Sequence, residues 1–361
     1  MYRPIPATAN SRQPSALIPN KLSPRVGPRI LVSMEYDPSV RIAGSGIAAL
    51  THHQSNGELA DLIGISAADI ESMSGVRRRY VADASMDLPT LHALACREAL
   101  GDAGPPDLII NASVGFHQLI PDTSVFIQRA LGLDGIPGFS MHATCLSFLH
   151  ALQVADAYLR TGAYRRILVT SAELNTRVRN FAEPESAALL GDAGAAVVLE
   201  PSTDGGIFHA SIRSFPESAE LTQVQGFGLR KHPLAEGTFA SDYLFTMDGP
   251  AVLKAALRRF LQHMTEVWRT SGMTREDIDL VVPHQPSGTG MRFLERYGFA
   301  PDKIVNVLAD YGNCSSVSIP LALATAHREG RLRSGAKVLL VGTGAGLSVG
   351  SILWRCPVAR P

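Results

Sequence analysis

Three side chains suited to acyl transfer each follow an apolar, strand-like run in this sequence. They are Cys145, His284 and Asn313, and the runs before them begin at residues 138, 280 and 304. A thiol is a nucleophile that forms thioesters, and an imidazole and a carboxamide can donate hydrogen bonds to a carbonyl oxygen. The set therefore predicts covalent acyl chemistry through Cys145.

Each of these residues also has an ordinary structural explanation. A cysteine beside an apolar helix is usually a small core residue, and an asparagine after a glycine is often a turn residue. Cys145, however, lies at the start of a predicted helix over residues 145–161, where unpaired N–H groups and the helix dipole favour a thiolate. Small neighbours, Thr144 and Ser147, leave room for a thioester. This placement favours the chemical role.

A glycine-rich loop at residues 341–350 is the fourth chemical element. A dinucleotide-binding fingerprint would need such a loop to open a helix, whereas residues 347–354 predict a strand. We therefore expect the backbone N–H groups at Gly344, Ala345 and Gly346 to face a reacting carbonyl, as in an oxyanion hole.

The elements that must position these groups occur in two similar sets. The predicted helix 145–161 is apolar on nearly every face, which is typical of a helix buried centrally, and a strand at 166–170 follows it. The second half repeats this order with a helix at 319–328 and a strand at 337–341. The pattern predicts an α/β fold, a layered sandwich of two similar halves at residues 39–205 and 206–361.

Composition excludes several other classes of protein. The chain of 361 residues has a formal net charge of zero, so no nucleic-acid or membrane partner is expected. Its four cysteines are widely spaced, which favours free thiols in a reducing, cytoplasmic compartment. We expect no metal and no cofactor. Residues 1–38 are rich in proline and have no acidic residue before Glu35, so they predict a disordered tail.

The order of motifs resembles the thiolase-fold condensing enzymes, most closely the β-ketoacyl-acyl-carrier-protein synthase III family. The motifs are Cys145, then Pro-His-Gln at 283–285 and Gly-Asn-x-Ser at 312–315, together with the run Gly-Asp-Ala-Gly-Ala-Ala-Val-Val-Leu at 191–199. The similarity spans residues 40–355. It implies an α-β-α-β-α sandwich and decarboxylative Claisen condensation of an acyl thioester with a malonyl-type thioester.

The resemblance also implies a role for each residue. Cys145 would carry the acyl group, while His284 and Asn313 would hold the thioester carbonyl of the extender as it loses CO₂. The partners would be acyl and malonyl thioesters on acyl carrier protein or coenzyme A, and the enzyme would be a homodimer. Leu119 and Ile120 resemble the segment that closes the acyl pocket of the partner subunit.

Some positions depart from the family pattern. Asp69 and Met73 stand where a Trp and an Arg grip coenzyme A, and Thr289 replaces an Arg that docks carrier protein. These differences predict a carrier-bound or unusual acyl donor and a role in specialised metabolism. Three alternatives stay open: acyl transfer to an oxygen or nitrogen acceptor, head-to-head condensation of two acyl chains, and a non-catalytic subunit of a heterodimer.

Overall fold

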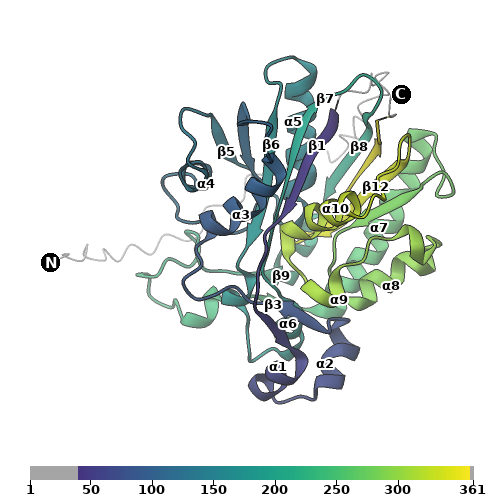
Figure 1. Ribbon diagram of the computed structural model, residues 1–361. Helices are drawn as coiled ribbons and strands as arrows, with labels where there is room; N and C mark the ends of the chain where they lie inside the picture. Colours follow the sequence, from purple (N-terminus) through teal and green to yellow (C-terminus); the bar gives the residue numbers. More distant parts are fainter. Residues whose placement is uncertain (1–39, 358–361) are drawn as a thin grey trace, which may run out of the picture. The chain divides into compact units, whose positions relative to one another are not determined.

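Two mixed β-sheets organise residues 40–357, the part of the chain that the computed structural model describes (Figure 1). The first sheet has the strand order β1–β7–β6–β4–β5, and the second has the order β11–β12–β13–β8. In the first sheet β4 is parallel to β6, and β6 is antiparallel to β7; β11, β12 and β13 repeat this arrangement in the second. The tail predicted at residues 1–38 lies outside the described residues.

The helices and strands have the following bounds. The first sheet contains β1 (Val40–Ile47), β4 (Leu108–Asn111), β5 (Gly138–Ser140), β6 (Ile167–Glu173) and β7 (Ala193–Pro201), and the second contains β8 (Gly206–Ser214), β11 (Leu280–Pro283), β12 (Lys337–Gly344) and β13 (Ser348–Arg355). Two small pairs are β2 (His53–Ser55) with β3 (Arg78–Tyr80) and β9 (Thr222–Gln223) with β10 (Thr246–Met247). The α-helices are α1 (Asn56–Ile63), α2 (Ala67–Ser74), α3 (Leu88–Leu100), α4 (Thr123–Leu131), α5 (Ser147–Arg160), α6 (Pro184–Leu189), α7 (Gly249–Ser271), α8 (Gly288–Tyr297), α9 (Leu308–Tyr311) and α10 (Ser318–Arg328). The short 3₁₀ turns include η1 (Thr144–Leu146) and η6 (Ser315–Val317).

The alternation of side chains along each strand produces the layers. In β4, Leu108 and Ile110 pack into the central core, whereas Ile109 packs into the core beneath α3 and α4. Successive residues of a strand point to opposite faces of the sheet, so both faces must be covered. Helices α5 and α10 supply the central core that both sheets share.

The outer faces are covered by different helices. α3 and α4 cover the first sheet, and α7 and α8 cover the second (Figure 1). In β12, Val338 and Leu340 face the central core, while Leu339 and Val341 face α7 and α8. The predicted layered sandwich is thereby confirmed.

One predicted element is wrong, and one boundary stays a prediction. The strand-like run at residues 304–308 forms no strand: Ile304 makes a single bridge with Val281, and Leu308 begins the short helix α9. The Asn306 side chain accepts a hydrogen bond from the backbone N–H of Leu308, which turns the chain. The two sheets use residues 40–201 and 206–355, which supports the proposed division after residue 205.

Candidate active site

Cys145 lies in the middle of the turn η1, between β5 and α5. Thr144, the residue before it, has a φ of 52°. A positive φ is uncommon for a residue with a side chain and is often found at functional sites. The Ser147 hydroxyl accepts a hydrogen bond from the Ala143 N–H and donates one to the Thr144 carbonyl, which holds the turn in place. The sequence predicts a helix from Cys145, whereas α5 begins two residues later.

Two glycines allow β12 to pass close to the catalytic candidates. A Cβ at Gly344 would lie 2.7 Å from the Thr144 hydroxyl oxygen, and a Cβ at Gly342 would lie 2.7 Å from the His284 Cβ. Any larger residue at these positions would push the strand away from the η1 turn or from His284. The glycine-rich loop therefore reaches Cys145 and His284 because Gly342 and Gly344 have no side chains.

His284 follows β11 directly, and its backbone N–H donates to the Val341 carbonyl at 2.8 Å. The side chain is 5% exposed, and burial lowers its pKa to about 4. Its Nδ1 has no hydrogen-bond partner among the described residues. The ring is therefore neutral at pH 7, with one N–H that can donate a hydrogen bond.

Asn313 is fixed by hydrogen bonds at both ends of its amide. Its Nδ2 donates to the Pro286 carbonyl at 3.2 Å, and its Oδ1 accepts from the Ser315 N–H at 2.9 Å. Its backbone N–H donates to the Leu189 carbonyl at 2.7 Å. Because an amide nitrogen carries two N–H groups, the second one can donate to a ligand.

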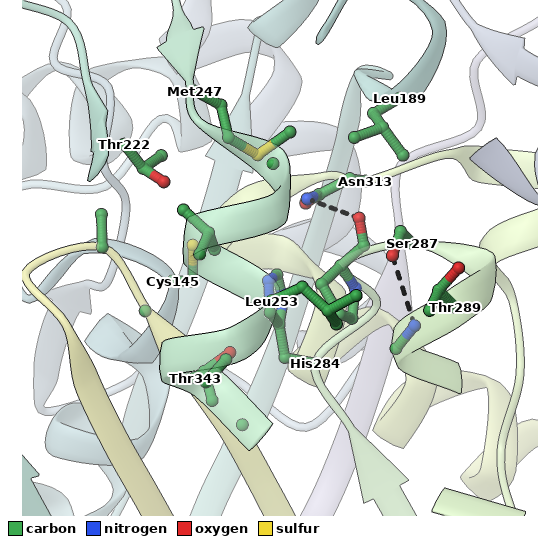
Figure 2. A pocket seen from close by; sticks show the side chains of 18 of the residues that line it. Cys145, Leu189, Thr222, Met247, Leu253, His284, Ser287, Thr289, Asn313 and Thr343 are labelled. Carbon is green, nitrogen blue, oxygen red and sulfur yellow. Dashed lines mark hydrogen bonds between the residues drawn. The ribbon is translucent and has the colours of Figure 1, made fainter. Parts of the chain in front are cut away.

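These three side chains line one cavity of about 400 Å³ (Figure 2). Figure 2 shows the Cys145 sulfur, the His284 ring and the Asn313 amide turned toward the same space. They come from different halves of the chain, and the fold brings all three together as the sequence predicts. Most of the remaining wall is apolar, and α7 and α8 supply much of it: Val252, Leu253, Ala256, Leu257, Phe260, Phe293 and Leu294.

The protonation state of Cys145 differs from the sequence-based expectation. The backbone N–H groups of Ala345 and Cys145 face the sulfur and favour a thiolate. Burial has the larger effect, and together with the charge of Glu173 it raises the pKa of the Cys145 thiol to about 11. The side chain nevertheless keeps partial access from the cavity. With this pKa Cys145 is a thiol at pH 7, in contrast to the thiolate that the helix terminus favours.

The other predicted residues divide between the cavity and the surface. Gly344 and Ala345 line the cavity, whereas Gly346 does not. Leu119 and Ile120 are 76% and 79% exposed and do not line the cavity of this chain. Two positions that depart from the family pattern, Met73 and Thr289, are part of the cavity wall, and Asp69 is not.

Sequence reasoning missed two carboxylates near this site. Glu173, at the end of β6, is 2% exposed, and its charge acts on the Cys145 sulfur. Glu185 lines the cavity and lies against Gly249, at the N-terminus of α7. An acidic residue that ends a wholly buried strand was the available signal for Glu173. Among residues 40–357 no cluster of His, Cys, Asp and Glu has the arrangement of a metal site.

Comparison with known proteins gives a consistent result. A family model described as 3-oxoacyl-[acyl-carrier-protein (ACP)] synthase III matches residues 139–216, and the model of its C-terminal part matches residues 268–356. The β-ketoacyl-[acyl-carrier-protein] synthase III of Neisseria gonorrhoeae is 33% identical over 319 residues, which are 87% of this chain and 98% of that protein.

Two solved structures have the same fold. The synthase III of Pseudomonas aeruginosa PAO1 matches with a TM-score of 0.81 at 27% identity, over 90% of this chain and 100% of that one. The priming β-ketosynthase from the R1128 polyketide biosynthetic pathway also matches with a TM-score of 0.81 at 27% identity, over 90% of this chain and 98% of that one.

The fold and these relatives define a condensing enzyme of the thiolase fold. More narrowly, because a relative with 33% identity is matched almost from end to end, the chain belongs to the 3-oxoacyl-[acyl-carrier-protein] synthase III family. The family and the acyltransferase class predicted from the sequence are confirmed. Among residues 40–357, no helix combines the length and the apolar character needed to cross a bilayer.

Proposed function

We propose that this protein joins an acyl thioester to a malonyl-type thioester by decarboxylative Claisen condensation, with the acyl group carried on Cys145. The observation that carries the proposal is the convergence of Cys145, His284 and Asn313 on one cavity. The presence of all three, with the cavity open beside them, argues against a non-catalytic subunit.

In the first half-reaction, the Cys145 sulfur attacks the acyl thioester carbonyl, and the thiol proton goes to the departing carrier thiolate. The tetrahedral oxyanion is held by the backbone N–H groups of Cys145 and Ala345, which face the sulfur. Preorganised donors of this kind stabilise charge that appears only in the transition state. The product is an acyl-enzyme and a free carrier thiol.

In the second half-reaction, the malonyl thioester loses CO₂ and becomes an enolate. The N–H of neutral His284 and the second amide N–H of Asn313 stabilise its oxygen, so no metal and no carboxylate base is required. The enolate carbon attacks the acyl carbonyl, the C–S bond to Cys145 breaks, and the released thiolate takes up a proton.

The test is intact-protein mass spectrometry together with CO₂ release. Wild-type protein should gain the mass of one acyl group on Cys145 and then lose it as a malonyl thioester is consumed. Cys145→Ala should do neither, and condensation that persists in this variant would refute the proposal. Release of the acyl group by an alcohol or an amine, or by a second acyl thioester instead of malonyl thioester, would identify the alternative reactions.

We further propose that the acyl donor is attached to a carrier protein. Among the described residues, no Lys or Arg lines the cavity, and Glu185 is its one charged residue. Coenzyme A carries several phosphate charges, which Glu185 would repel, whereas the arm of a carrier protein brings a single phosphodiester to the entrance. A donor of this kind fits a role in fatty-acid-like or polyketide metabolism.

A homodimer is the proposed assembly, with Leu119 and Ile120 forming part of the acyl pocket of the partner subunit. Their high exposure in the single chain supports this, because large apolar side chains gathered on a surface commonly mark an interface. Sedimentation equilibrium and the chain-length preference of Ile120→Ala test the assembly and the pocket separately. The four cysteines are all free thiols, which supports a cytoplasmic location.

A further inference from the structure

Glu173 is a buried carboxylate that the proposed reaction does not use. Its hydrogen bond from Ser316 places it against the turn η6, and that turn contacts η1, which carries Cys145. Burial raises the pKa of Glu173 to about 7. Among the described residues, no Lys, Arg or His forms an ion pair with it. An unpaired buried carboxylate is costly, and such groups occur more often at functional sites than in ordinary cores.

Three donors hold this carboxylate in one orientation. Its Oε1 accepts hydrogen bonds from the Val114 N–H and the Ser316 hydroxyl, and its Oε2 accepts from the Gly115 N–H at 3.0 Å. The Ser316 hydroxyl also pairs with the Ser171 hydroxyl at 2.7 Å. Glu173 therefore ties β6 to the loop after β4 and to the turn that follows Asn313.

The internal repeat places Glu173 beside a turn equivalent to the one that carries Cys145. Ser316 is the counterpart of Cys145: each is the middle residue of a 3₁₀ turn before a central helix, and each follows a residue of positive φ, at 48° for Ser315 and 52° for Thr144. The two turns contact each other, and each also contacts the strand of the opposite half, η1 with β12 and η6 with β6. The end of β12 brings an N–H to Cys145, and the end of β6 brings a carboxylate to Ser316.

We propose that Glu173 is a positioning residue for Cys145. The negative charge of Glu173 adds to burial in keeping the resting sulfur protonated until an acyl thioester occupies the oxyanion hole. The inference rests on the proposed role of Cys145 as the nucleophile. In the free enzyme the buried charge opposes a second negative charge on the sulfur. Once the thioester is attacked, the negative charge moves to the carbonyl oxygen, where the two backbone N–H groups meet it.

The pH dependence follows from the groups that surround the pair. Asp192, Cys145 and Cys314 interact electrostatically with Glu173, and neutral His284 shares the cavity with Cys145. Below the pKa of Glu173 the neutral acid allows the thiolate to form more easily; above it the carboxylate opposes the thiolate. A plot of log alkylation rate against pH should therefore rise, flatten near pH 7 and rise again.

The experiment measures alkylation of Cys145 by iodoacetamide across pH 5.5–10, followed by intact-protein mass spectrometry. Cys145→Ser provides the background from the other thiols. Glu173→Gln should remove the inflection and raise the rate at pH 8. Because a thiolate becomes less nucleophilic as its pKa falls, each unit of lowered pKa should give about a three- to fourfold gain. Ser316→Ala keeps the charge but removes one donor, so the inflection should persist at a higher pH.

Several results would overturn the proposal. A wild-type profile that is a single straight line would do so, and this measurement needs no variant to fold. A folded Glu173→Gln protein with an unchanged profile would do so as well, because a purely structural residue alters stability and leaves the profile in place. Condensation that persists in Cys145→Ala would instead reject the proposed function, which keeps the two ideas separate.

Discussion

Replacing Asn313 with alanine should slow decarboxylation of a malonyl thioester by about 10²–10³, while acylation of Cys145 stays within a few-fold of wild type. A single preorganised donor to a developing oxyanion contributes about this factor, which corresponds to about 2.7–4 kcal/mol. Asn313 also receives a hydrogen bond from the Ser315 N–H and donates one to the Pro286 carbonyl. Losing both should lower the free energy of unfolding by about 2 kcal/mol.

The two half-reactions can be measured separately. Acylation is followed as the gain of mass on Cys145 in the absence of malonyl thioester, and decarboxylation is followed as CO₂ release. Asn313→Asp is a sharper variant, because it keeps the size of the side chain and the acceptor for Ser315. It presents an oxygen to the Pro286 carbonyl at 3.2 Å where wild type has a donor, so CO₂ release should fall as in the alanine variant.

A matched control separates chemistry from stability. Asn56 also makes two side-chain hydrogen bonds, to the Val76 carbonyl and from Arg79, but it does not line the cavity. Asn56→Ala should therefore cost stability, measured by urea unfolding, and leave CO₂ release per folded molecule unchanged. Equal losses in both half-reactions for Asn313→Ala, or normal CO₂ release in either Asn313 variant, would refute the assigned role.

Three further predictions follow from the same structure. Gly344→Ala places a Cβ against the turn that carries the nucleophile, so acylation, measured by mass gain, should fall at least about tenfold; a normal rate would mean that the loop can shift freely. Glu185→Gln should raise kcat/KM for acyl-coenzyme A more than for acyl carrier protein, and an equal change in both would remove the electrostatic argument. Burial lowers the pKa of His92 to about 3 and of His263 to about 4, against about 6.5 in the unfolded chain, so both contribute stability above pH 6.5 that is lost as the pH falls toward 4. Each should cost about 1.4 kcal/mol per pH unit in that window, partly offset by the raised pKa of Glu173, and a urea midpoint equal at pH 7 and pH 5 would contradict this.

The sequence predicts the placement of the three principal side chains because each lies at a turn with a strong local signal. His284 follows a short apolar run that ends in Pro283, and the run forms a strand as expected. Asn313 is also in the cavity, although the element before it is a helix rather than a strand. A short apolar run does not distinguish these two structures, and the hydrogen bond that the Asn306 side chain accepts from the Leu308 N–H decides between them.

The parts that sequence did not predict depend on burial, which no local pattern reports. The helix-terminus argument expects N–H groups at Cys145; the two that face the sulfur belong to Cys145 itself and to Ala345. The argument also cannot weigh them against the loss of solvent around the sulfur. The sequence also did not predict that α7 forms the apolar wall of the cavity. An amphipathic helix has the same pattern whether it covers a core or a cavity. Leu253, for example, lines the cavity in Figure 2.

The duplicated fold gives the Cys145 sulfur two neighbours with opposite effects on the pKa of its thiol. On one side, the end of β12 supplies the Ala345 N–H, which favours negative charge, and glycine at 344 lets it come close. On the other side, the end of β6 supplies Glu173, which opposes negative charge. Substitutions on the two sides should therefore move the pKa of Cys145 in opposite directions, upward for Gly344→Ala and downward for Glu173→Gln. A double variant whose alkylation profile lies between those of the two single variants is the outcome this arrangement requires, because the two effects act on the same charge.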